Sequence, residues 1–206
     1  KKILRGMGPE FSEQELISVH SVSKGILGER GIRGGYMELV NIEEEIRDQF
    51  YKLASVSLCP NITGQIMVDL MVNPPKKGDQ SFPLYEKEIH DQFESLSRRA
   101  NFLSGALSSI DGIDCQTING AMYAFPSISL PQKAVDEAKR RGVTPDAMYC
   151  MDLLHQTGVC VVPGSGFGQR DGSYHFRTTI LPPEKELEEM ISRLKGFHSA
   201  FMQQYQ

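Results

Sequence analysis

Apolar residues in the middle of the chain recur every three or four positions, the spacing that places side chains on one face of an α-helix. The series comprises Tyr85, Ile89, Phe93, Leu96, Ala100, Leu103 and Leu107. It predicts a helix of about 25 residues. Such a helix is long enough to span the molecule and to join two lobes.

Shorter helices are predicted on both sides of this long one. Asn41, with Glu44 three residues later, forms a capping-box pattern in which Asn41 is the cap of a helix. A second helix is expected over Ile62–Val72, because the Asn-Pro-Pro that follows stops it. Three more helices are predicted near the end of the chain, over residues 132–141, 145–157 and about 184–205.

Strand patterns occur in two places. Residues 16–20 predict a buried strand and residues 36–40 alternate like another, with a glycine-dense loop over residues 24–35 between them. Farther along, residues 113–117 and 121–129 predict two strands around a turn at Asn119-Gly120. Further strands are predicted over residues 159–162 and 174–181. The first half is therefore expected to be mainly helical and the second half to be compact α+β.

Composition limits the class of protein. The chain has 206 residues, of which 40% are apolar and 23% are charged, as in ordinary globular proteins. A net charge of −4 disfavours a nucleic-acid coat or a basic membrane-binding surface. No apolar run approaches the ~18 residues of a membrane span, and the early Gly6, Gly8 and Pro9 argue against a signal peptide. The four cysteines lack any CxxC pair and are expected to be reduced structural thiols, with no metal site.

Candidate chemistry gathers in the glycine-dense loop. Lys24 stands at its start, after Ser21 and Ser23 and before Arg30 and Arg33. Hydroxyl and guanidinium groups can together bind a phosphate dianion, and nearby positive charge makes a lysine amine more nucleophilic. Pyridoxal phosphate is the cofactor that needs both an anchored phosphate and a lysine.

The same residues resemble a known family. The string S-x-S-K followed by G-x-x-G-x-R-G-G-Y is similar to the cofactor-lysine motif of class I/II aminotransferases. The resemblance implies that Lys24 forms a Schiff base with pyridoxal 5′-phosphate, and that Ser21 and Arg33 hold the phosphate with Ser23 assisting. Arg33 lies one residue farther from Lys24 than in the usual class I motif, as in the alanine aminotransferase branch. Arg30 remains a second cationic candidate.

Three later strings also resemble the alanine aminotransferase branch, over residues 119–126, 161–169 and 175–182. By this likeness Arg177 binds the α-carboxylate of the substrate, and a planar guanidinium on a rigid strand suits that task. An ion pair with an acidic residue is the alternative role for Arg177. His175 is expected to be a hydrogen-bonded structural histidine. Residues 164–168 lack the spacing of a nucleotide-binding loop and are expected to form a wall of the substrate pocket.

The resemblance implies an α/β chain of the pyridoxal-phosphate fold type I. Residues 1–80 would complete the large domain, residues 81–111 would form a linking helix, and residues 112–206 would form the small α+β domain. The ring-binding Asp of the family and its early phosphate loop would precede this chain, as its start without Met also suggests. The chain is therefore expected to be a C-terminal part, weak or inactive alone.

The implied activity is transfer of an amino group from L-alanine to 2-oxoglutarate, giving pyruvate and L-glutamate. A homodimer is expected, with small amino-acid and 2-oxo-acid substrates and no nucleic-acid or membrane partner. A cytoplasmic location is expected, while mitochondrial and peroxisomal locations are also compatible. Two alternatives stay open: a glutamate–glyoxylate aminotransferase of the same branch, and a non-catalytic fragment that only folds or dimerises.

Overall fold

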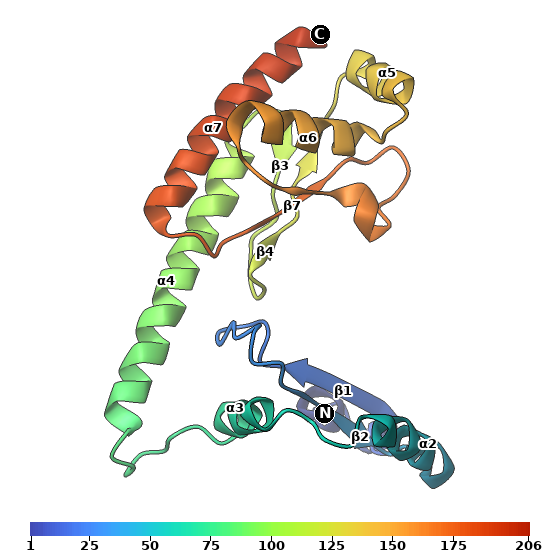
Figure 1. The fold of residues 1–206 in the computed structure, drawn as a ribbon, viewed down its shortest axis with the longest axis vertical. Helices are drawn as coiled ribbons and strands as arrows, with labels where there is room; N and C mark the ends of the chain where they lie inside the picture. The colour runs from blue at the N-terminus through green and yellow to red at the C-terminus, as the bar shows by residue number, and fades with distance from the viewer. The chain divides into compact units, whose positions relative to one another are not determined.

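The computed structural model describes residues 1–206, which divide into two compact units, Lys1–Glu88 and Ile89–Gln206. The division falls within the long helix α4 (Phe82–Ser108) (Figure 1). This helix confirms the long helix predicted in the middle of the chain. None of the helices combines the length and apolar character that a membrane span requires. The domain limits at residues 80 and 112 remain a prediction.

The first unit is built around a two-stranded antiparallel sheet. Strand β1 (Leu16–Ser21) pairs with β2 (Gly35–Val40), so that Ser21 lies opposite Gly35. Both strands were predicted, but β1 is not buried, because Val19 is 74% exposed. The remaining elements are α1 (Lys2–Gly6), η1 (Pro9–Phe11), α2 (Glu44–Ala54), η2 (Ser55–Ser57) and α3 (Ile62–Val72).

The predicted capping box at Asn41 is wrong. Asn41 has a φ of +54°, and its Nδ2 donates to the backbone oxygens of Ser12 (2.6 Å) and Gln14 (3.1 Å). Asparagine tolerates this left-handed conformation and bonds readily to nearby backbone. Asn41 therefore turns the chain after β2, and α2 begins only at Glu44 without a side-chain cap bond. Helix α3 matches its prediction, with Asn61 Oδ1 accepting from the Thr63 amide at 3.1 Å.

The first unit has almost no apolar core. Val22 is its only buried hydrophobic side chain, whereas Ile62, Ile66 and Leu70 are all exposed along α3. Burial of apolar surface is the dominant favourable term in folding. The first unit therefore derives little stability from its own hydrophobic contacts.

The second unit contains short strands covered by helices. Strands β4 (Tyr123–Ala124), β7 (Phe176–Thr179) and β6 (Val162–Pro163) form one antiparallel sheet in that order. Strands β3 (Ile113–Asp114) and β5 (Ser127–Ile128) form a second pair. The other elements are α5 (Gln132–Arg141), α6 (Pro145–Thr157), η3 (Gly164–Phe167) and α7 (Glu184–Gln204), and the three helices agree with their predictions.

The two strands predicted around a turn at Asn119-Gly120 are confirmed in part. Ile113 pairs antiparallel with Ile128 and Asp114 with Ser127, as a reversal of the chain near Gly120 requires, while Tyr123 pairs with Thr179 in a different sheet. Pro126 separates β4 from β5, and proline cannot donate to a ladder. The predicted long strand over residues 121–129 is thereby divided into two short strands with different partners. The predicted strands over residues 159–162 and 174–181 are likewise reduced to β6 and β7.

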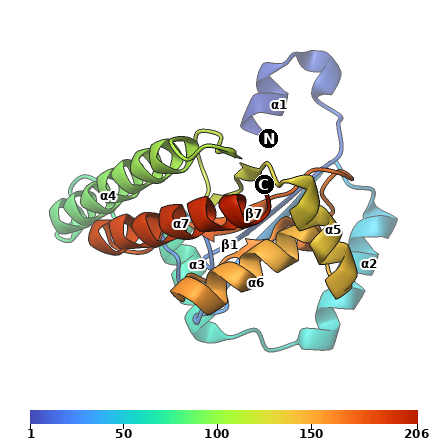
Figure 2. The ribbon, with the colours of Figure 1, turned by 90° about the horizontal axis from the view of Figure 1, so that it is seen from above.

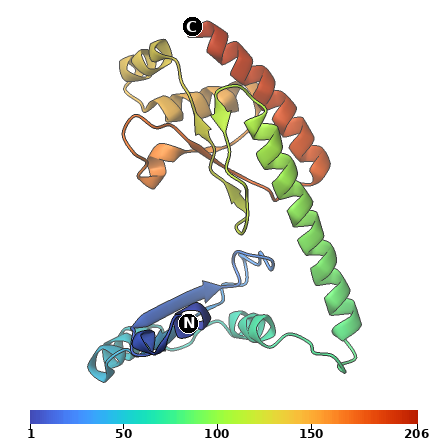
Figure 3. The ribbon, with the colours of Figure 1, turned by 180° about the vertical axis from the view of Figure 1, so that it is seen from behind.

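The core of the second unit lies between α4, α6 and α7. Tyr149 on α6 is fully buried, and its ring centroid lies 5.1 Å from those of Phe197 and Phe201 on α7. Helix α7 runs beside the later part of α4 (Figures 1 to 3). The four cysteines are free: Cys115 and Cys150 are buried, as expected of structural thiols, but Cys59 and Cys160 are exposed.

His198 makes the stability of this core pH-dependent. Its Nε2 donates to the Asp111 oxygen (2.8 Å), so Nδ1 accepts from the Tyr149 hydroxyl (2.9 Å). Burial lowers the pKa of His198 below its ordinary value of 6.5, although the bond to Asp111 opposes this. Between the lowered pKa and about pH 6.5 the unfolded chain binds more protons than the folded chain.

Stability from His198 is thus complete above pH 6.5 and falls as the pH drops towards the lowered pKa. We expect a loss of about 1.4 kcal/mol for each unit by which that pKa is lowered. Urea unfolding between pH 7.5 and 5.5, followed by signals of the second unit, measures this loss. His198→Gln should flatten the pH dependence, while the exposed His155→Gln should leave it unchanged. Equal slopes in the wild type and His198→Gln would contradict the assignment.

Candidate active site

The loop between β1 and β2 is anchored by one buried residue. Val22 follows the last residue of β1 and is 0% exposed. Its amide donates to the Gly34 oxygen at 3.1 Å, and its oxygen accepts from the Glu29 amide at 2.9 Å. These bonds tie both sides of the loop to one point, so the residues next to Val22 are held in place.

Two serines and an arginine that the sequence singled out meet in this loop. The Ser23 amide donates to Ser21 Oγ at 3.3 Å, and Arg33 Nη1 lies 3.4 Å from Ser23 Oγ. Arg33 Nη1 also donates to the Arg30 oxygen at 3.0 Å, and Arg33 has a φ of +60°. Since this φ is uncommon for a residue with a side chain, the loop holds Arg33 in a special conformation. Ser21, Ser23 and Arg33 form a group of donors suited to an anion.

Lys24 is the next residue after Ser23, and its side chain is exposed. Its oxygen accepts from the Gly28 amide at 3.4 Å, and both Gly25 and Gly28 have a positive φ. The glycines thus allow the chain to turn back immediately after Lys24. The lysine amine therefore belongs to the same short loop as the anion-binding group. Arg30 is also exposed there, and its backbone oxygen is what supports Arg33.

The loop packs directly on α3 through two glycines. A Cβ on Gly34 would lie 2.5 Å from the Gly64 oxygen, and a Cβ on Gly64 would lie 2.7 Å from the Arg33 oxygen. Asn61 Nδ2 donates to the Ile32 oxygen at 2.6 Å. Sequence reasoning missed both Asn61 and Gly64, although a lone glycine within a helical pattern often marks a close backbone approach.

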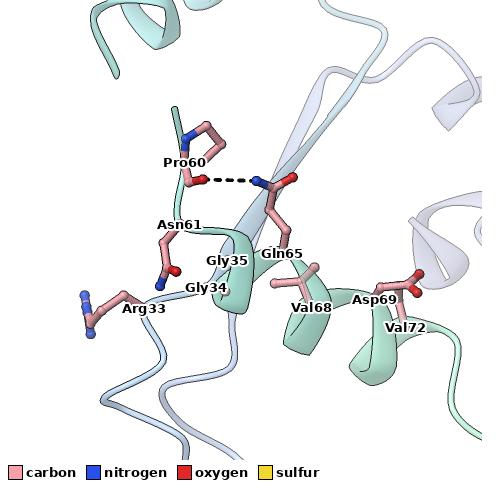
Figure 4. A pocket seen from close by; sticks show the side chains of 10 residues that line it. Arg33, Gly34, Gly35, Pro60, Asn61, Gln65, Val68, Asp69 and Val72 are labelled. Atoms are coloured by element: carbon pink, nitrogen blue, oxygen red, sulfur yellow. Dashed lines mark hydrogen bonds between the residues drawn. The ribbon is translucent and has the colours of Figure 1, made fainter. Parts of the chain in front are cut away.

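An open cleft lies between this part of the loop and α3. It has a volume of about 280 Å³ and is lined by Arg33, Gly34, Gly35, Pro60, Asn61, Gly64, Gln65, Val68, Asp69 and Val72. Figure 4 shows the lining side chains of α3 in succession, with Arg33 at the end nearest Asn61. The cleft therefore adjoins the loop that holds the candidate anion-binding group.

Gly34→Ala should displace the loop, because the added methyl group would meet rigid backbone. We expect this overpacking to cost about 1–3 kcal/mol. Faster hydrogen exchange at the Val22 amide, which donates to the Gly34 oxygen, is the measurement. Gly31→Ala is the matched control, since a Cβ there meets nothing within 4 Å. Unchanged exchange in Gly34→Ala would show that the close approach is not required.

Arg177 lies on β7 in the second unit, opposite Val162. Its Cζ lies 4.7 Å from the ring centroid of Tyr123 and 4.7 Å from that of Phe167. Two aromatic rings are thus its neighbours, and the ion pairs of this unit do not include Arg177. The sequence did not indicate Tyr123 or Phe167 as partners of Arg177. Their proximity follows from pairing of β4 with β7 and from the turn at η3, which have no local signal.

Two other features were predicted in this unit, at His175 and at residues 164–168. His175 is hydrogen-bonded, as expected, because its Nδ1 lies 3.0 Å from Gln169 Oε1. Residues Gly164–Phe167 form the 3₁₀ turn η3, which brings Phe167 to Arg177. The structure thus groups Ser21, Ser23, Lys24 and Arg33 in one unit and Arg177 with its aromatic neighbours in the other.

Comparisons with known proteins find aminotransferases, although no protein-family model matches the chain. The chain is 53% identical to "Probable alanine aminotransferase, mitochondrial" of Dictyostelium discoideum over 205 residues, which are 100% of this chain and 38% of the relative. It is 46% identical to "Alanine aminotransferase 1" of Bos taurus over 206 residues, which are 100% of this chain and 42% of that protein. The chain thus spans about 40% of the length of these curated relatives.

Solved structures show the same fold. An alanine aminotransferase from Pyrococcus furiosus superposes with a TM-score of 0.71 and 30% identity, covering 90% of this chain and 42% of that one. An aspartate aminotransferase from Rhizobium meliloti gives 0.68 and 28%, covering 89% and 42%. The predicted α/β fold of type I is confirmed. Over its whole length the chain is similar to alanine aminotransferases, of which it spans about 40%.

Proposed function

We propose that this chain supplies the cofactor lysine, the phosphate-binding loop and the carboxylate-binding arginine of a pyridoxal-phosphate-dependent alanine aminotransferase. The observation that supports this best is the grouping of Ser21, Ser23 and Arg33 beside Lys24 in one anchored loop. It occurs in a chain that matches alanine aminotransferases along its entire length. A lysine in an unrelated loop would have no reason to adjoin such an anion-binding group.

The loop residues fit the cofactor's phosphate. Two hydroxyl groups and a guanidinium group offer several donors to a dianion, and the guanidinium carries the compensating charge. Ser23 Oγ and Arg33 Nη1 already lie 3.4 Å apart, so little rearrangement is needed to direct both at one phosphate. When bound, pyridoxal phosphate supplies an electron sink for amino-group transfer.

Lys24 and Arg177 then have separate tasks. Lys24 Nζ takes the proton from the substrate α-carbon and later returns a proton, as general base and general acid. Arg177 binds the substrate α-carboxylate through two parallel N–H groups, which fixes the orientation of the α-carbon. We infer that residues 1–80 belong to the large domain, that 81–111 link, and that 112–206 form the small domain.

The substrates follow from the resemblance and from the names of the relatives. L-alanine and 2-oxoglutarate give pyruvate and L-glutamate in the proposed reaction. A homodimer is proposed for the intact enzyme, and the cytoplasm is proposed as its location. Two relatives are named as mitochondrial proteins, so cell fractionation tests the location.

Initial rates with the full-length enzyme test the function. The pair L-alanine and 2-oxoglutarate should give the highest kcat/KM. If L-glutamate and glyoxylate give a higher value, the chain belongs to the sister activity. If the folded, cofactor-treated protein transfers no amino group from any of these donors, the non-catalytic alternative holds.

A further inference from the structure

A buried carboxylate lies close to the candidate substrate-binding half of the site. Asp146, in the first turn of α6, is 0% exposed. Its Oδ2 accepts from the Ser165 amide at 2.6 Å and from Gln169 Nε2 at 3.1 Å. Burial acts to raise the pKa of Asp146, but hydrogen bonds outweigh it and hold this pKa below its ordinary value. Asp146 is therefore a fixed negative acceptor inside the second unit.

Asp146 determines how Gln169 is oriented. Since Gln169 Nε2 donates to Asp146, its Oε1 faces the other way and lies 3.0 Å from His175 Nδ1. An amide oxygen only accepts, so Nδ1 of His175 carries the proton. A Cβ on Gly164 would lie 2.3 Å from Gln169 Oε1 and 2.7 Å from His175 Cβ. Because Gly164 has no side chain, Gln169 and His175 have the space to contact each other beside it.

Aromatic contacts continue from His175 to Arg177. The His175 ring stacks on Phe125, with centroids 4.9 Å apart and planes at 5°. Phe125 meets Phe167 edge to face, with centroids 5.7 Å apart and planes at 88°. Phe167 in turn lies 4.7 Å from Arg177 Cζ. We call Phe125, Phe167 and His175 the aromatic wall.

We propose that Asp146 and Gln169 are positioning residues that fix His175, and that His175 in turn fixes the rest of the aromatic wall. The wall thereby holds Arg177 ready for a carboxylate. The part concerning the carboxylate rests on the proposed function of Arg177. A guanidinium has its N–H groups in its own plane, so a ring over its face leaves the donors available at its edge. A wall held by hydrogen bonds to a buried carboxylate also restrains the Arg177 side chain before it binds. Less side-chain entropy is therefore lost on binding.

The order of the Arg177 side chain is the direct readout. In the full 206-residue chain, NMR of the Arg177 Nε–H group should show a rigid, ring-shifted signal. Phe167→Leu should make the group mobile and remove most of the shift. Phe167 is 47% exposed, so this variant is expected to fold. Carboxylate affinity, measured by titration with 2-oxoglutarate, should fall about two- to fivefold, as expected for loss of one cation–π contact.

Variants of the positioning residues test the link to the wall. Gln169→Leu and His175→Ala should loosen Arg177, whereas the exposed helix residues Gln156→Leu and His155→Ala should not. His175→Phe keeps a ring against Phe125 and should restore order relative to His175→Ala. Folding is checked by the dispersed signals of the core around Tyr149.

Two different results separate this inference from the proposed function. If Arg177 stays rigid and equally shifted in Phe167→Leu, Gln169→Leu and His175→Ala, the positioning role is overturned. If the variants loosen Arg177 as expected but 2-oxoglutarate never perturbs its signals in the full-length enzyme, the positioning role is supported. The assignment of Arg177 as the carboxylate-binding residue then fails instead.

Discussion

Replacing Lys24 with alanine should stop amino-group transfer by the full-length enzyme, with kcat lowered about 10³-fold or more. Under the proposed function, the variant loses both the amine that joins the cofactor and the group that moves a proton at the substrate α-carbon. No other lysine lies in the loop between β1 and β2, so no neighbouring amine can replace it. Steady-state rates with L-alanine and 2-oxoglutarate measure the loss.

Two controls make this result specific. Lys24→Arg keeps the positive charge of the loop but not a lysine amine, and it should be about as inactive as Lys24→Ala. Lys76→Ala removes an exposed lysine from the same unit and should leave kcat within about twofold. A Lys24→Ala enzyme with more than a tenth of the wild-type kcat would contradict the role assigned to Lys24.

Arg177→Gln should lower kcat/KM about 10²–10⁴-fold, mainly through a higher KM for both substrates. Each hydrogen bond to a charged group contributes about 1.5–3 kcal/mol, and the variant loses two of them along with the charge. Arg177→Lys keeps the charge without the planar pair of donors, so its loss should be intermediate. The measurement is the dependence of initial rate on each substrate.

A surface arginine serves as the matched control for Arg177. Arg98 forms an exposed ion pair with Glu184 in the same unit, and such pairs contribute little. Arg98→Gln should therefore leave kcat/KM within about twofold. If Arg177→Gln raises neither KM by more than threefold, Arg177 does not bind the carboxylate.

Helices were predictable because their signals are local. The periodic apolar residues of α4, the proline stop after α3 and the Pro145 and Gly158 limits of α6 all lie within the element that they define. The capping box predicted at Asn41 is wrong because a local pattern does not reveal contacts with residues distant in sequence. The residue pattern was correct, but Asn41 is used by contacts to Ser12 and Gln14, far away along the chain.

Strands were less predictable because they depend on partners distant in sequence. The ladder pairing Tyr123 with Thr179 joins segments that no turn motif connects. The strands predicted around Asn119-Gly120 do pair, at Ile113 and Ile128, but the prediction did not anticipate the interruption at Pro126. Alternation of apolar residues indicates a strand, but it does not show which strand will pair with it.

The site follows the same division. Motif residues around Lys24 were found from sequence because they are adjacent in one loop. Asn61 and Gly64 support that loop from α3, and Tyr123 and Phe167 flank Arg177 from other elements. Their positions in sequence do not show which candidate site residue each contacts, and only the folded chain brings them together.

Locating the cofactor on the chain tests most directly whether Lys24 is the cofactor lysine. The full-length enzyme is loaded with pyridoxal phosphate, reduced with borohydride and digested, and the labelled peptide is identified by mass spectrometry. We expect one label, on Lys24, which is absent from Lys24→Ala. A label on a different lysine, or a folded and active enzyme without any label, would contradict it.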